Sequence, residues 1–230
     1  MSLALITGGS AGFGQALIEE LTEQGWQIVA DGRDAERLHA IGRPNVTTVA
    51  GDIADSQHRR DLAAVIGDRP LDLLVNNAST LGQLPLPRLL EADLTAIAQS
   101  YQVNVIAPLG LIQLLQTNLQ QTHGTVVNIS SDAALADYEG WGGYGSGKAA
   151  LDQLTRTLAA EVPDITWYAV DPGDMRTEMH RAAFPDEDIS DRPLPEAVVP
   201  ALLNLLAIRP ASSRYQLADF LNPLSAKGTS

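Results

Sequence analysis

Short apolar runs alternate with helical patterns along this chain, and this alternation limits it to one class of fold. The predicted strands lie at residues 3–7, 27–31, 46–50, 71–76, 124–130, 165–170 and 214–217. The predicted helices lie at 14–24, 35–41, 56–66, 91–118 with an interruption, 145–160 and 195–208. Strands that alternate with helices form a mostly parallel sheet, and strands that are apolar throughout are covered on both faces. The sequence therefore predicts an α/β fold with a doubly wound sheet of seven strands.

The length of the chain agrees with one domain. A chain of 230 residues buries roughly 70–75% of the surface that it exposes when unfolded. A hydrophobic core of this size needs no disulfide bonds or metal ions to stabilise it. We predict a single domain over residues 1–230. Its least regular part is the segment at about 171–195, which is rich in proline and acidic residues. A long irregular segment is either a functional loop or a solvated surface loop, and we interpret this one as a substrate loop.

Charge and residue types exclude several functions. The net charge of −13 is opposite in sign to that of nucleic-acid and anionic-membrane partners. The chain has no cysteine, and its four histidines lack the spacing of metal ligands, so we predict no metal site. The N-terminus has no signal-peptide pattern, and no apolar run has the length of a membrane helix. We therefore expect a cytoplasmic protein with no nucleic-acid or membrane partner.

A glycine-rich turn joins the first strand to the first helix and reads T-G-x-x-x-G-x-G. Glycine permits positive φ and close approach to an anion, and a helix N-terminus adds partial positive charge. The turn therefore suits the pyrophosphate of a dinucleotide, although a tight connection alone would also explain it. The residues that we expect to bind the cofactor here are Gly8, Ser10, Gly12, Phe13 and Gly14.

A serine, a tyrosine and a lysine follow the fifth strand. Ser131 precedes Tyr144 by thirteen positions, and Tyr144 and Lys148 share one face of a predicted helix. A phenol has an ordinary pKa of ~10, and a nearby ammonium lowers that value. The pattern thus predicts that Tyr144 is a general acid and base. The alternative is an ordinary surface pair, but Lys148 is one of only two lysines in the chain.

These motifs together resemble the short-chain dehydrogenase/reductase family over about residues 3–217. The resemblance rests on the glycine turn, Asn-Asn-Ala at 76–78, Y-x-x-x-K at 144–148 and P-G-x-x-x-T at 172–177. The chain departs from the family pattern at Ser79, where the family has glycine, at Gly147, and in lacking the C-terminal D-G-G turn. The resemblance implies a Rossmann-like sheet and hydride transfer between a nicotinamide and a carbonyl or alcohol.

The resemblance also assigns roles. Ser131 would bind the substrate oxygen, Tyr144 would transfer its proton, and Lys148 would bind the nicotinamide ribose. Asn104 would hold a relay water through a backbone carbonyl that Pro108 leaves free. Besides the residues of the glycine turn, the implied cofactor residues are Arg33, Asp52, Ile53, Asn77, Ala78, Tyr144, Lys148, Pro172, Gly173 and Thr177.

The end of the second strand bears on the choice of cofactor. An acid there binds the ribose of NAD, whereas an arginine accommodates the 2′-phosphate of NADP. The acid position falls on Gly32 and Arg33 follows it, which favours NADP(H). Asp31 leaves NAD(H) possible, because a slip of one residue would place it at the acid position.

The sequence indicates only the chemical class of the substrate. The candidate pocket residues, each of which could equally be core packing, are Ser131, Tyr138, Trp141, Met179, His180 and Phe184. Aromatic and methionine side chains suit a bulky apolar carbonyl compound. The main hypothesis is an NADP(H)-preferring carbonyl reductase or alcohol dehydrogenase that forms a homodimer or homotetramer. The alternatives are a non-catalytic nucleotide sensor and, less favoured, epimerisation or dehydration at the same site.

Overall fold

The computed structural model describes residues 1–221, and residues 222–230 of the expected domain lie outside the described part. It contains one parallel sheet in the order β3-β2-β1-β4-β5-β6-β7. The strands are β1 (Leu3–Ile6), β2 (Gln27–Gly32), β3 (Val46–Ala50), β4 (Leu73–Asn76), β5 (Thr125–Ile129), β6 (Thr166–Asp171) and β7 (Ser213–Gln216). The predicted doubly wound fold is thus confirmed. The strand order reverses between β1 and β4, and such a switch point opens a crevice at the carboxyl ends of the strands.

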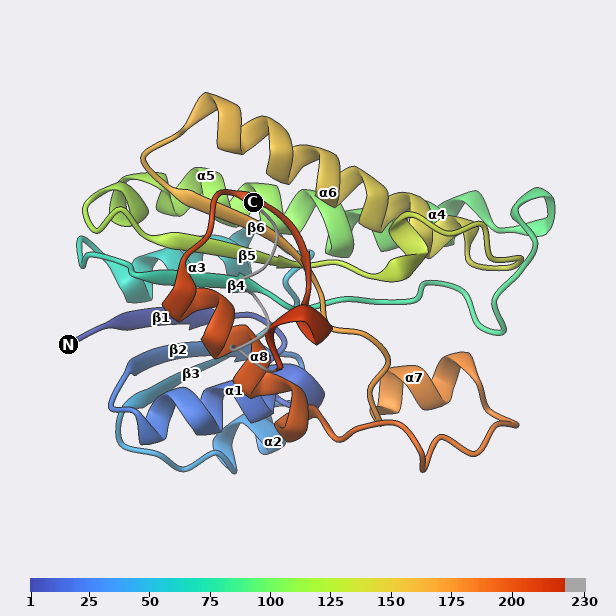
Figure 1. The fold of residues 1–230 in the computed structure, drawn as a ribbon, viewed down its shortest axis with the longest axis horizontal. Helices are drawn as coiled ribbons and strands as arrows, with labels where there is room; N and C mark the ends of the chain where they lie inside the picture. Colours follow the sequence, from blue (N-terminus) through green and yellow to red (C-terminus); the bar gives the residue numbers. More distant parts are fainter. Residues whose placement is uncertain (222–230) are drawn as a thin grey trace.

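Helices cover both faces of the sheet, as Figure 1 shows. They are α1 (Gly12–Glu23), α2 (Ala35–His39), α3 (Ser56–Ile66), α4 (Leu94–Tyr101), α5 (Ala107–Gln120), α6 (Gly142–Glu161), α7 (Glu178–Ala183) and α8 (Pro195–Ile208). Successive residues of a strand point to opposite faces. Ala4 and Ile6 of β1 therefore join the core under α1 and α8, whereas Leu3 and Leu5 join the core under α3 and α5.

The predicted helix at 91–118 is interrupted in the structure. It begins later, as α4, and passes through a π-helical turn at Gln102–Ile106 before α5 continues it. Pro108 lies in the first turn of α5 and has no N–H to donate to the preceding turn. The proline therefore marks the place where the regular α-helical bonding changes, and Asn104 lies within the altered turn.

The segment at 171–195 contains a helix that the sequence analysis leaves out. This helix, α7, begins after Thr177, whose hydroxyl accepts a hydrogen bond from the backbone N–H of His180. A threonine at this position satisfies one of the free N–H groups of a helix start. The segment expected to be the least regular part of the chain is therefore helical over Glu178–Ala183. Within residues 1–221, no helix has both the length and the apolar character needed to cross a membrane.

Candidate active site

A cleft of about 530 Å³ runs along the carboxyl ends of the strands. The glycine turn lies at one end, and the Ser131–Tyr144–Lys148 group lies at the other. Of the residues expected to bind the cofactor, the ones that line this cleft are Gly8, Ser10, Gly12, Phe13, Arg33, Asp52, Ile53, Asn77, Ala78, Tyr144, Lys148, Pro172, Gly173 and Thr177. Gly14 and Asn104 do not line it, and the structure gives both of them supporting positions.

The glycine turn has the backbone form that its sequence predicts. Gly8 and Gly12 have φ values of 66° and 56°, in the left-handed region that favours glycine. A Cβ atom on Gly14 would collide with the carbonyl oxygen of Gly8 and with the side-chain amide of Asn77. Gly14 therefore permits the turn to close on itself. The open backbone at the start of α1 fits the pyrophosphate of a dinucleotide.

Asp31 points beneath this turn. Its Oδ1 accepts a hydrogen bond from the backbone N–H of Gly8 at 2.8 Å, and its Oδ2 lies 3.1 Å from Nε2 of His58. Asp31 lines the cleft, but its side chain is buried and both carboxylate oxygens have partners within the protein. The hydrogen bond to Asp31 raises the pKa of His58 above its ordinary value.

Gly32 and Arg33 follow Asp31 at the end of β2. Gly32 has no side chain, and a Cβ there would come within 2.9 Å of the Ser10 hydroxyl. Arg33 is exposed and lines the cleft. A carboxylate is thus absent from the acid position, and a guanidinium stands next to it.

Two residues of α3 support the cofactor end of the cleft, and the sequence analysis missed both. His58 holds Asp31, as described above. Arg59 is buried, and its Nη1 donates to the carbonyl oxygens of Ile53 at 2.6 Å and Ala54 at 2.9 Å. Ile53 lines the cleft, so Arg59 fixes the wall of that end. No local pattern marks these residues, because polar residues in the first turns of a helix are ordinarily solvated.

Tyr144 and Lys148 lie on α6 and are both buried. Lys148 Nζ lies 5.5 Å from the centroid of the Tyr144 ring and donates to the carbonyl oxygen of Ile129 at 2.7 Å. Burial raises the pKa of Tyr144 to about 12, although hydrogen bonds with the hydroxyls of Ser79 and Ser131 act in the opposite direction. Burial also lowers the pKa of Lys148 to about 8, although the charge of Asp152 opposes this.

Desolvation is the largest cause of the raised pKa of Tyr144, because burial disfavours the charged form of a phenol. The effect of Lys148 on this pKa stays a prediction. At neutral pH Tyr144 carries its proton, which suits a proton donor.

Asn104 uses its side chain to hold the segment after β4. Its Oδ1 accepts from the Ser79 hydroxyl at 3.1 Å and from the Thr80 N–H at 3.0 Å. Its Nδ2 donates to the Thr80 carbonyl at 2.8 Å and to the Ser100 hydroxyl at 3.2 Å. Asn104 thus fixes Ser79, which brings a hydroxyl to Tyr144 where the family pattern has glycine. The role of its backbone carbonyl stays a prediction.

The substrate end of the cleft contains four of the six expected pocket residues. Ser131, Trp141, Met179 and His180 line the cleft. Two others do not, and the expectation for them was wrong. Tyr138 is exposed at the surface, where its hydroxyl donates to Asp132 Oδ2 at 2.9 Å.

The other misplaced residue is Phe184, whose ring packs behind the lining. Its centroid lies 5.6 Å from that of Trp141 and 4.9 Å from that of His180. Lining residues that the sequence analysis missed include Leu81, Gly82, Leu84, Asp132, Asp174, Met175, Ala182 and Ala183. Residues 1–221 hold no group of three or more His, Cys, Asp or Glu placed to bind a metal ion.

Comparisons with known proteins identify the family of this chain. A family model for short chain dehydrogenase matches residues 2–188. The benzil reductase ((S)-benzoin forming) of Bacillus subtilis (strain 168) is 35% identical over 188 residues, which cover 78% of this chain and 76% of that protein. The L-xylulose reductase of Bos taurus is 34% identical over 189 residues, which cover 80% and 75%.

A solved structure shows the same arrangement. A short chain dehydrogenase from Escherichia coli CFT073, in complex with NADPH, superposes with a TM-score of 0.86 at 26% identity, covering 94% of this chain and 96% of that chain. The family model covers most of the chain, and the named relatives are dehydrogenases or reductases. The chain therefore belongs to the short-chain dehydrogenase/reductase family and is an NAD(P)-dependent oxidoreductase.

Proposed function

We propose that this protein is an NADP(H)-preferring oxidoreductase that interconverts a carbonyl compound and an alcohol, with Tyr144 as its general acid and base. The observation that carries the proposal is the buried Tyr144 phenol at one end of the cleft. It lies among Ser131, Ser79 and Lys148, and the same cleft contains the glycine turn. A nucleotide sensor would have no use for this set of groups.

The groups of the site support the reduction of a carbonyl. When bound, the nicotinamide supplies the hydride that the carbonyl carbon receives. The Ser131 hydroxyl, which now donates to Asp132 Oδ1 at 3.0 Å, would turn to donate to the substrate oxygen. Tyr144 gives its proton to that oxygen, which completes the alcohol. The buried Lys148 ammonium favours the tyrosinate that remains, because opposite charges nearby stabilise each other.

The end of β2 supports the preference for NADP(H). Asp31 is held inward by Gly8 and His58, so its carboxylate does not repel a 2′-phosphate at the cleft surface. Arg33 stands exposed beside the cleft, and a guanidinium binds phosphate well. The similar structure in complex with NADPH agrees with this assignment.

The substrate end supports an apolar carbonyl compound. Leu81 and Ala133 pack around Tyr144, with Trp141 and Met179 against them. The Trp141 ring meets the Tyr144 ring edge-on, with centroids 5.7 Å apart. A flat or branched apolar group fits such a wall, and a relative named benzil reductase is consistent with it.

We also infer that the protein is a cytoplasmic homodimer or homotetramer. Three apolar side chains are exposed: Leu94 of α4, Ile106 in the turn before α5, and Leu114 of α5. Exposed apolar side chains favour burial against a second subunit. Sedimentation of the purified protein tests the oligomer directly, and a monomer at micromolar concentration would contradict it.

The experiment that tests the function follows the oxidation of NADPH and of NADH against a panel of ketones, aldehydes, quinones and diketones. The expected result is turnover of an apolar carbonyl that is faster with NADPH and is lost in Tyr144→Phe. Binding of both cofactors by titration, with no turnover of any carbonyl or alcohol, would favour the sensor instead.

A further inference from the structure

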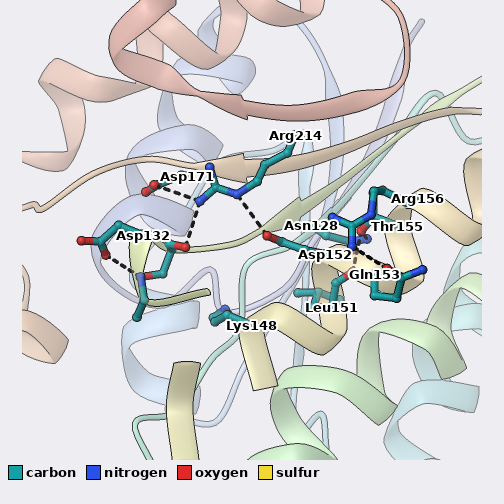
Figure 2. A network of polar contacts seen from close by, with 12 residues as sticks. Asn128, Asp132, Lys148, Leu151, Asp152, Gln153, Thr155, Arg156, Asp171 and Arg214 are labelled. Atoms are coloured by element: carbon teal, nitrogen blue, oxygen red, sulfur yellow. Dashed lines mark hydrogen bonds and ion pairs between the residues drawn. The ribbon is translucent and has the colours of Figure 1, made fainter. Parts of the chain in front are cut away.

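Arg214 of the edge strand β7 reaches into the site from the far side of the sheet. Its Nη2 donates to the Ser131 carbonyl oxygen at 2.9 Å and to Asp171 Oδ2 at 3.2 Å. Its Nε donates to Asp152 Oδ2 at 3.0 Å. Figure 2 shows the guanidinium between Asp171 and Asp152, with Lys148 close to the same network. One side chain thus joins β5, β6, α6 and β7.

Each acceptor of Arg214 is next to a residue of the proposed mechanism. The first is the carbonyl of Ser131 itself, the residue that would bind the substrate oxygen. The second, Asp171, also accepts the backbone N–H of Gly173 at 3.0 Å, and Gly173 lines the cleft in the left-handed conformation, with φ 74°. Asp171 therefore shapes the turn after β6, and Arg214 holds Asp171.

The third acceptor, Asp152, lies four residues after Lys148 and so shares its face of α6. The charge of Asp152 raises the pKa of Lys148 against the effect of burial. The same guanidinium that fixes Ser131 therefore also fixes the carboxylate nearest to the active-site lysine.

Charge gives Arg214 a second effect. The side chains of Asp152 and Asp171 are 3% and 6% exposed, and that of Arg214 is 15% exposed. Two buried carboxylates without a cation would be costly, and their field would reach the site with little screening. The guanidinium of Arg214 supplies the positive charge that compensates both carboxylates. The groups whose charges raise the pKa of Tyr144 include Asp132 and Asp171.

We propose that Arg214 is a positioning residue that holds Ser131, the turn after β6 and the Lys148 face of α6 in one arrangement and neutralises the two carboxylates beside them. This inference rests on the proposed function, because its effect on the chemistry acts through Ser131, Tyr144 and Lys148. Arg214 itself touches neither substrate nor reacting atoms.

The test compares Arg214→Met with Arg214→Lys and with the control Arg156→Met. Arg156 lies exposed on the same helix, α6, and within residues 1–221 its guanidinium donates to Gln153 alone. We expect Arg214→Met to lower kcat for carbonyl reduction by about tenfold or more, since a charged hydrogen-bond donor is lost. We also expect NADPH, followed by its fluorescence, to bind about tenfold more weakly through the displaced turn at Gly173. Arg214→Lys should recover part of both losses, and Arg156→Met should resemble the wild type.

The pH profile separates this role from simple anchoring of β7. With the carboxylates no longer neutralised, the pKa of Tyr144 rises, so the pH at which alcohol oxidation becomes half-maximal should increase by roughly half a unit or more. In the double variant Arg214→Met with Asp171→Asn, the pH of half-maximal alcohol oxidation should return toward the wild-type value. An anchoring residue would change thermal stability and kcat without this shift and reversal.

Two results overturn the inference. One is an unchanged pH profile in Arg214→Met. The other is unchanged NADPH binding in Arg214→Met and Arg214→Lys, each shown to be folded by its unfolding curve. If Arg214→Met does not fold, NADPH binding by Arg214→Lys decides the positioning role, because lysine keeps the charge but not the fork of hydrogen bonds, and unchanged binding overturns the inference. A wild type that turns over no carbonyl or alcohol contradicts the proposed function instead, and the binding comparison still decides the role of Arg214.

Discussion

The two halves of the sheet keep buried carboxylates at their carboxyl ends, but with different cations. In the half formed by β1, β2 and β3, Asp31 lies under the glycine turn and pairs with His58. In the half formed by β4 to β7, Asp152 and Asp171 lie behind the proposed catalytic group of Ser131, Tyr144 and Lys148 and pair with Arg214. The first network supports the cofactor, and the second supports the proposed chemistry.

The difference lies in which cation can titrate. Histidine changes its charge between about pH 5 and 8, and arginine does not. The network under the cofactor turn should therefore respond to pH, whereas the network behind Ser131 and Lys148 keeps its charge. The division also predicts that substitutions in the first half change cofactor affinity alone. Substitutions in the second half change turnover, and they change cofactor affinity only where they displace the turn at Gly173, as Arg214→Met does.

The largest expected effect belongs to the catalytic half. Tyr144→Phe removes the proton donor but leaves the ring, so turnover should fall by about 10²–10⁴-fold. Cofactor affinity, measured by titration, should stay within about twofold, because the hydroxyl acts on the substrate proton. The matched control is Tyr168→Phe, since burial raises the pKa of that tyrosine to about 12 as well but its hydroxyl bonds to the Pro210 carbonyl outside the cleft.

Loss of cofactor binding together with activity in Tyr144→Phe would break the division between the halves. Loss of activity in Tyr168→Phe would show that any buried phenol matters, and the assignment of Tyr144 would then have no support from this experiment.

Arg33 carries the next largest effect, in the cofactor half. Arg33→Ala should weaken NADPH by roughly 10–100-fold, since a hydrogen bond to a charged group contributes about 1.5–3 kcal/mol. The affinity for NADH should change little. The measurement is the dissociation constant of each cofactor for wild type and variant, and equal losses for both cofactors would contradict a role for Arg33 at the 2′-phosphate.

Gly14 tests the shape of the glycine turn. Gly14→Ala adds a methyl that meets the Gly8 carbonyl oxygen, and overpacking of this kind costs about 1–3 kcal/mol. We expect lower stability in denaturant unfolding and weaker binding of both cofactors. The control is Gly143→Ala in α6, where the nearest atom to an added Cβ is a side-chain carbon of Ile97 at 3.6 Å. Equal effects of the two substitutions would show that the turn has no special geometric demand.

The smallest effect is the pH response of the cofactor half. Asp31 raises the pKa of His58 in the folded protein, so this pair stabilises the fold fully below the ordinary histidine pKa of ~6.5. That contribution is lost as pH rises through the raised value. His58→Gln keeps a hydrogen-bond donor without the charge. At acidic pH the free energy of unfolding of the wild type should exceed that of the variant by about 1 kcal/mol.

Free energies of unfolding from pH 5 to 9 measure this difference. The two curves should converge as pH rises, whereas a constant or growing difference would mean that His58 is held neutral.

Much of the fold follows from local patterns. The bounds predicted for β3, α3 and α8 match those in the structure. For the two helices, strong start signals in the sequence explain the match. Asp55 accepts the Gln57 N–H at the start of α3, and Pro195 opens α8. The helix α7 was missed, because six residues give too little periodicity to be read from the sequence.

The sequence by itself determined the βα alternation, the glycine turn and the spacing of Ser131, Tyr144 and Lys148, since each depends on residues near one another in the chain. Only the tertiary structure decided that the Asp31 carboxylate is buried, that burial raises the pKa of Tyr144, and that Arg214 reaches the site. Arg214 and Ser131 lie 83 positions apart in the chain. Such contacts depend on which face of the sheet each side chain takes and on how deeply it is buried, and both arise only when distant strands are brought together.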